Sequence, residues 1–154
     1  MTFLELLKPE AVKVVAAASS KKRLMHDIAD LVHVSYGLDH GVVVEALMER
    51  ESLGPTGVGR GVALPHARLP NLDRVLGTFI LLEKPIDFGS VDREPVDVVF
   101  SLFAPEDAGV EHLKALALVS RTLREASVCS KLRANPDPAT LYAVLTEAQS
   151  VQAA

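Results

Sequence analysis

The sequence predicts an α/β domain in which a small mixed β-sheet is flanked by helices on both faces. Near both ends of the chain, apolar residues recur at the three- and four-residue spacing of amphipathic helices. In the middle, short apolar runs rich in β-branched residues alternate with turn residues, which is typical of buried strands. The 154 residues contain no internal repeat and no linker, so we expect residues 1–154 to form one domain.

The first third of the chain predicts one strand and two helices. Residues 11–16 are apolar enough for a short strand, and the serines at 19–20 are expected to cap the helix that follows. Gly37 suits the end of that helix. Asp39 can cap a second helix, which the Gly-Pro pair at 54–55 stops.

The middle of the chain predicts the rest of the sheet. Residues 61–64, 75–82 and 95–103 are short, apolar and partly β-branched, so we expect buried strands there. Turn residues separate these strands, at Pro70-Asn71, Lys84-Pro85 and Phe88-Gly89-Ser90.

The last third predicts three helices, over 110–125, 127–134 and 138–148. The first has apolar residues at 113, 116, 117, 119 and 123. Asp137 followed by a proline is a typical start for the final helix.

Composition excludes several classes of function. The net charge is −4 with acidic and basic residues intermixed, which argues against general nucleic-acid binding and leaves room for a basic protein partner.

Cys129 is the single cysteine, so it can form no internal disulfide, and we interpret it as a small apolar residue on a helix. No apolar run is long enough to span a bilayer, and charged residues interrupt the N-terminal segment. We therefore expect a cytoplasmic protein.

The densest functional signal is the segment 54–68, GPTGVGRGVALPHAR. Gly57, Gly59 and Gly61 alternate, and a glycine-rich turn can expose successive backbone N–H groups to an anion. The segment is neither a P-loop nor a dinucleotide-binding motif, because no Gly-Lys pair follows and the strand comes after the glycines. A tight turn with positive φ angles explains the glycines equally well.

Four side chains suggest phosphate chemistry. His66 follows a predicted strand and a proline, at a place where α/β proteins tend to bind ligands. His112 lies in the first turn of a predicted helix, where a neutral imidazole can donate to a phosphate oxygen. Arg50 and Arg68 each carry a guanidinium that can contact two phosphate oxygens. For each of these side chains an interpretation without function also stays open. His66 can be an exposed histidine with no role, His112 a histidine at the edge of the core, and Arg50 an arginine that only complements the helix dipole.

A metal site is a competing local interpretation. It would need carboxylates beside His66 and His112, and Asp73, Asp92 and Asp107 are available. Their spacing matches no metal motif, so we predict no metal. The remaining histidines have no carboxylate at a telling spacing and are expected to serve in packing or at the surface, namely His26, His33 and His40.

Segment 54–68 resembles the active-site segment of the IIA proteins of the phosphotransferase system, in the fructose, mannitol and nitrogen-regulatory family. Their pattern is roughly T-G-x-G-x-G, aliphatic, A, aliphatic, P-H. Residues 86–125 also resemble this family, with a D-F pair, a P-V-D before a strand, a proline, and H-L-x-x-L in a helix. The resemblance covers about residues 10–148, and its wording over 104–124 is most similar to the nitrogen-regulatory branch.

The resemblance implies roles for individual residues. His66 takes the place of the phosphorylated histidine, while His112 and Arg50 take the places of residues that support the site. We expect the phosphoryl group also to contact Thr56, Gly57, Gly59 and Arg68. Arg60 departs from the pattern, since mannitol-type members often have glutamate there and nitrogen-type members asparagine.

The function that the resemblance implies is that of a phosphocarrier. His66 would accept a phosphoryl group from a phosphohistidine on an HPr-like protein, without metal, nucleotide or other cofactor, and the phosphorylation state would regulate target proteins. Two alternatives stay open: a sugar-specific IIA component that feeds a IIB permease domain, and a non-catalytic interaction domain. The oligomeric state, including a homodimer, also stays open.

Overall fold

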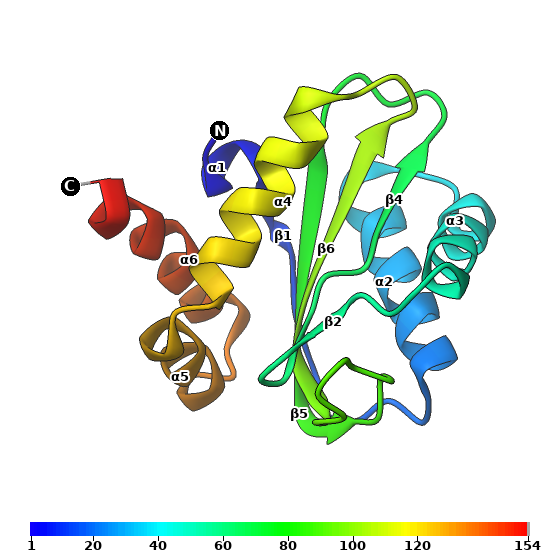
Figure 1. Cartoon of the computed structure of the whole chain (residues 1–154). Coiled ribbons are helices and arrows are strands. Elements are labelled where there is room, and N and C mark those ends of the chain that lie inside the picture. Colours follow the sequence, from blue (N-terminus) through cyan, green and yellow to red (C-terminus); the bar gives the residue numbers. More distant parts are fainter. Residues whose placement is uncertain (154) are drawn as a thin grey trace.

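The computed structural model describes the backbone of residues 1–153 and the side chains of residues 1–148. A single mixed sheet forms its centre (Figure 1). The strands are β1 Leu7–Val15, β2 Gly57–Gly59, β3 Val62–Ala63, β4 His66–Leu69, β5 Leu76–Ile86 and β6 Val96–Pro105. The helices are α1 Phe3–Leu6, α2 Lys21–Tyr36, α3 His40–Ser52, α4 Val110–Leu123, α5 Ala126–Ala134 and α6 Pro138–Ala153.

The sheet has the order β1-β5-β6-β3-β2, with β4 also paired to β6. Strands β5 and β6 are antiparallel, whereas β1 runs parallel to β5. Strands β3 and β4 follow one another along the same edge of β6 and both run parallel to it. The predicted mixed α/β fold is therefore confirmed, and the two short strands on β6 are what carry the site.

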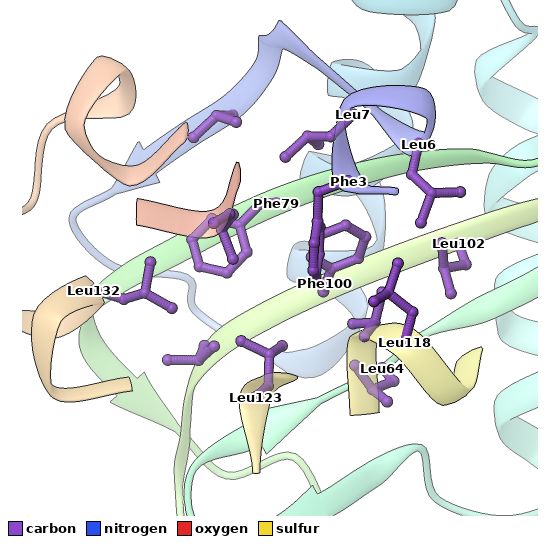
Figure 2. Close-up of a cluster of buried hydrophobic side chains, with 14 of the residues drawn as sticks. Phe3, Leu6, Leu7, Leu64, Phe79, Phe100, Leu102, Leu118, Leu123 and Leu132 are labelled. Carbon is purple, nitrogen blue, oxygen red and sulfur yellow. The ribbon is translucent and has the colours of Figure 1, made fainter. Parts of the chain in front are cut away.

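Helices cover both faces of the sheet, as predicted. Helices α2 and α3 lie on one face, and α4, α5 and α6 lie on the other (Figure 1). Because side chains alternate along a strand, neighbouring residues of β5 enter different cores. Phe79 packs with Phe100 and Phe3 on the α4 side, while Ile80 packs on the α2 side. Figure 2 shows the first of these clusters, in which Leu64 lies beside Leu118 of α4.

The predicted helix caps are present. The Ser20 hydroxyl accepts a bond from the backbone N–H of Arg23, and Asp39 does the same for Val42. Gly37 has φ +73° after α2, which an L side chain rarely adopts. Asp137 accepts from the backbone N–H of Thr140 at the start of α6.

Three local expectations were wrong or incomplete. Strand β1 begins at Leu7, not at residue 11, and it includes Pro9, which an edge strand tolerates. The Lys84-Pro85 pair lies inside β5 and not in a turn, since β5 continues to Ile86. The short helix α1, with Phe3 and Leu6 buried, was not predicted.

Not all of the apolar residues that predicted α4 face the core. Leu113 is 66% exposed, and residue 117 is exposed as well. The side chains that face the core are those of His112, Ala115, Leu118, Val119, Thr122 and Leu123.

No helix in the described part of the chain is long and apolar enough to cross a membrane.

The aromatic cluster gives a test of the core. Phe100 is fully buried, and its ring lies 5.6 Å from that of Phe3 and 6.2 Å from that of Phe79, measured between centroids. We expect Phe100→Ala to lower the free energy of unfolding by about 3–5 kcal/mol, because it removes apolar contacts and leaves a cavity. Urea denaturation measures this, and Val34→Ala, at a position 79% exposed, serves as the control. Equal stability of the two variants would contradict the packing described.

Candidate functional site

A hollow of about 400 Å³ lies where α3 ends, β4 begins and α4 begins. Three elements that are distant in sequence line it together, because β4 lies between β6 and α3 in the fold (Figure 1). Its residues are Ala46, Glu49, Arg50, Leu53, His66, Ala67, Arg68 and His112. Four of the seven residues predicted for the site, His66, His112, Arg50 and Arg68, are thus brought together.

His66 stands at the junction of two strands. Pro65 separates β3 from β4, and its carbonyl accepts a bond of 3.1 Å from the backbone N–H of Leu102 in β6. The chain then continues as β4 from His66 to Leu69. A parallel pairing with β6 on both sides of the proline therefore sets the direction of the imidazole.

The two ring nitrogens of His66 have different partners. Nδ1 lies 2.8 Å from the carbonyl oxygen of Leu64, and since a carbonyl can only accept, Nδ1 carries the proton. Nε2 accepts a bond of 3.3 Å from Nε of Arg50. Burial lowers the pKa of His66, the bond to Leu64 opposes this, and the charge of Arg50 lowers the pKa further. The ring is therefore neutral near pH 7, with its lone pair on Nε2.

His112 is buried beside His66 with an unused nitrogen. Its exposed fraction is 6%, and the two rings lie edge to face with centroids 5.6 Å apart. Its Nε2 has no hydrogen-bond partner among the described residues. Burial lowers the pKa of His112 to about 4, with smaller contributions from His66 and Arg68. Burying such a nitrogen without a hydrogen-bond partner costs about 1–3 kcal/mol. A polar ligand that bonds to this nitrogen would recover that cost.

Arg50 and Arg68 have different hydrogen-bond partners. Arg50, in the last turn of α3, donates through Nη1 to the carbonyl of Gly54 at 3.0 Å and through Nε to His66. Arg68 is exposed and donates through Nη1 to the carbonyls of Glu106 and Ala108. Arg68 thus ties β4 to the loop that precedes α4, and a contact with phosphate remains a prediction for it.

The first turn of α4 has no side-chain cap. Gly109 occupies the N-cap position, so no side chain satisfies the N–H groups at this end. A helix N-terminus favours an anion and disfavours a cationic imidazole, which agrees with a neutral His112 at its third position.

Three of the predicted binding residues do not line the hollow. Thr56 is buried and donates through its backbone N–H and its hydroxyl to the carboxylate of Glu51. Gly57 pairs with Ala63 in the β2–β3 hairpin, where a Cβ would lie 2.3 Å from the hydroxyl oxygen of Ser90.

Gly59 has φ +101° and lies against Asp92, also away from His66. Neither glycine is among the residues that line the hollow, so their contact with a phosphoryl group stays a prediction. The glycines serve close approach and positive φ angles, which is the tight-turn interpretation that the sequence left open.

The histidines outside the hollow required one correction. His40 does have a carboxylate partner, since its Nε2 lies 3.0 Å from Asp30 Oδ1, and its ring stacks on that of His26. The pairing was missed because it joins the start of α3 to α2, ten positions back in the chain. Within the part of the chain whose side chains are described, no group of three or more His, Cys, Asp or Glu could hold a metal ion.

One residue of the site was not predicted at all. Glu51 follows Arg50 on α3, its side chain is only 7% exposed, and it pairs with Lys21 at 2.7 Å. Nothing in the local sequence distinguishes it from a surface glutamate, because Lys21 is thirty positions away.

Residues 5–148 match the family described as "Phosphoenolpyruvate-dependent sugar phosphotransferase system, EIIA 2". The chain belongs to this family. EIIA proteins are phosphotransfer components.

Similar proteins agree with the nitrogen-regulatory resemblance. The nitrogen regulatory protein of Bradyrhizobium diazoefficiens is 45% identical, over 94% of this chain and 95% of its own length. The crystal structure of nitrogen regulatory protein IIA-Ntr from Neisseria meningitidis is 34% identical and has a TM-score of 0.84, covering 92% of this chain and 97% of that one. Mannitol IIA from Escherichia coli, at 20% identity and a TM-score of 0.75 over 90% and 97% of the chains, shares the fold.

The depressed pKa of His112 predicts a pH-dependent stability. The pKa of His112 is about 4 in the folded EIIA domain and near the ordinary 6.5 when the imidazole is exposed, so the unfolded chain binds more protons between these values. We expect stability to fall as the pH drops from 6.5 to about 4, and His112→Gln to remove part of that slope. Urea denaturation at a series of pH values measures it. An unchanged slope in the variant would mean that His112 is not held neutral by the fold.

Proposed function

We propose that this EIIA domain is a phosphocarrier that accepts a phosphoryl group on Nε2 of His66 from a phosphohistidine of an HPr-like protein. One observation carries the proposal: Nδ1 of His66 is bonded to a backbone carbonyl, which leaves the lone pair on the nitrogen that faces the guanidinium of Arg50. A neutral imidazole with a fixed tautomer is a ready nucleophile.

The transfer balances without a cofactor. The Nε2 lone pair of His66 forms a bond to phosphorus while the bond from phosphorus to the donor's ring nitrogen breaks, and that electron pair stays on the donor. His66 then carries the phosphoryl group on Nε2 and its proton on Nδ1, so the ring is cationic. The Leu64 carbonyl, 2.8 Å from Nδ1, stabilises this charge.

Two neighbours would stabilise the phosphoryl oxygens. The guanidinium of Arg50 would turn from Nε2 toward the oxygens, while its bond to the Gly54 carbonyl keeps it in place. The unpaired Nε2 of His112, as an N–H donor, would bind another oxygen from the buried side. Phosphoryl transfer depends mainly on such positioning and charge stabilisation.

The proposed downstream role rests on the names of similar proteins. Since the proteins of highest quoted identity are named nitrogen regulatory proteins, we propose that the phosphorylation state of His66 regulates partner proteins in the cytoplasm. A phosphoryl group adds nearly two negative charges to the mouth of the hollow, which is enough to change which partners dock. Passage of the phosphoryl group to a IIB permease domain would instead identify a sugar-specific component.

Reconstituted phosphotransfer tests the proposal. With enzyme I, an HPr-like carrier and labelled phosphoenolpyruvate, we expect the wild-type chain to take up label and His66→Ala to take up none. His33→Ala, at an exposed histidine outside the hollow, is the matched control and should label normally. A wild-type chain that stays unlabelled while the carrier is phosphorylated would leave the interaction domain as the better interpretation.

Arg50→Ala tests the guanidinium. We expect the rate of phosphoryl transfer to fall about 10- to 100-fold, because a charge-assisted hydrogen bond is worth about 1.5–3 kcal/mol. The same change should raise the pKa of His66, since a neighbouring cation is removed. Rapid-quench kinetics and an NMR titration of the imidazole measure the two effects, with Arg121→Ala on the exposed side of α4 as control. Wild-type kinetics in Arg50→Ala would remove Arg50 from the mechanism.

A further inference from the structure

Glu51 holds a buried carboxylate at the centre of a hydrogen-bond network. Its Oε1 lies 2.7 Å from Nζ of Lys21 and accepts the backbone N–H of Thr56 at 2.9 Å. Its Oε2 accepts the Thr56 hydroxyl at 2.6 Å. Both oxygens of the carboxylate are therefore used, and Thr56 is held by its main chain and its side chain together.

Lys21 is fixed in turn. Its Nζ donates to the carbonyl of Phe88 at 2.9 Å and lies 4.3 Å from the centre of the Phe88 ring. Phe88 itself is buried. The cation that neutralises Glu51 is thus anchored at the start of α2 and in the loop after β5, and the network joins three parts of the fold.

The network continues from Thr56 to His66 through the main chain. The carbonyl of Thr56 accepts the backbone N–H of Leu64 at 2.9 Å. The carbonyl of Leu64 accepts Nδ1–H of His66 at 2.8 Å. The Leu64 side chain is buried beside α4, and both its N–H and its carbonyl are hydrogen-bonded, so the backbone of Leu64 has little freedom (Figure 2).

Arg50 and Glu51 are therefore connected to opposite nitrogens of one imidazole. Arg50 bonds to Nε2 directly, and Glu51 is linked to Nδ1 through Thr56 and Leu64. Consecutive residues of a helix point about 100° apart, so the last turn of α3 can reach Nε2 directly through Arg50 and Thr56 through Glu51. From this geometry we propose that Glu51, supported by Lys21, is a positioning residue that holds the Leu64 carbonyl against Nδ1 and so keeps the reactive lone pair of His66 on Nε2. The importance of this for transfer rests on the proposed function, whereas its effect on the tautomer does not.

A purely structural role for Glu51 makes a different prediction. If the carboxylate only stabilised the fold, Glu51→Gln would lower the free energy of unfolding and leave the His66 ring unchanged. If it positions the ring, the tautomer and the transfer rate change in molecules that are still folded. Gln keeps the shape of the side chain but offers one acceptor oxygen in place of two and cannot pair with Lys21 as a charge.

The decisive measurement is the tautomer of His66 in the unphosphorylated protein, read from the nitrogen chemical shifts of its imidazole by NMR. We expect Nδ1–H in the wild type and a mixture with Nε2–H in Glu51→Gln. Loss of one well-placed hydrogen bond corresponds to about a five- to tenfold change in an equilibrium or a rate, and we expect phosphoryl transfer to slow by that factor. Lys21→Met should act in the same direction, because it leaves Glu51 without its cation.

Glu45→Gln is the matched control, since it removes one carboxylate from an exposed position of the same helix. It should leave both the tautomer and the rate at wild-type values. A wild-type tautomer in folded Glu51→Gln would overturn the positioning role, and Thr56→Val provides a second variant should Glu51→Gln fail to fold. A shifted tautomer in a chain that accepts no phosphate even as wild type would instead refute the phosphocarrier function and leave the positioning role intact.

Discussion

The hydrogen bond between Nδ1 of His66 and the carbonyl of Leu64 is the interaction on which the rest of the site depends. It decides which nitrogen is protonated, and hence where the lone pair of the ring lies. The bond joins residues only two positions apart, yet local sequence does not make it. It lies at the break between β3 and β4, two strands that pair with β6 in one continuous register and so hold residues 64–66 in place.

The remainder of the site is arranged around that ring by longer-range contacts. Helix α3 supplies Arg50 at Nε2, and α4 supplies a buried neutral imidazole with an unused nitrogen. The hollow between them holds two guanidinium groups and no buried carboxylate facing the ring, since Glu51 turns toward Thr56 and Lys21. An anion entering this hollow would meet positive charge and hydrogen-bond donors, as the proposed phosphoryl transfer requires. Burial is the main cause that lowers the pKa of both histidines, and neighbouring charged side chains lower it further.

Local signals predicted most of the secondary structure. Serine and aspartate before apolar periodic segments placed the starts of α2, α3 and α6 correctly, because a capping side chain acts on N–H groups only two or three residues away. Expectations failed where a distant element overrode the local preference. The Lys84-Pro85 pair predicted a turn, yet it continues β5. There the backbone N–H of Lys84 donates to the carbonyl of Ala16. Leu113 is one of the apolar residues whose spacing predicted α4. In the structure, however, Leu113 is exposed and the neighbouring His112 faces the core.

By itself, the sequence determined the fold class, the starts of α2, α3 and α6, and His66, His112 and Arg50 as a candidate set. The fold class and the helix starts follow from short-range periodicity and caps, and the candidate set follows from two short motifs that resemble one family. Only the tertiary structure decided that the glycines lie away from the ring, that Arg68 binds the loop before α4, and that Glu51 is buried on Lys21. Each of these depends on pairing across the sheet or between helices, and such contacts join residues whose separation in sequence carries no information about their distance in space.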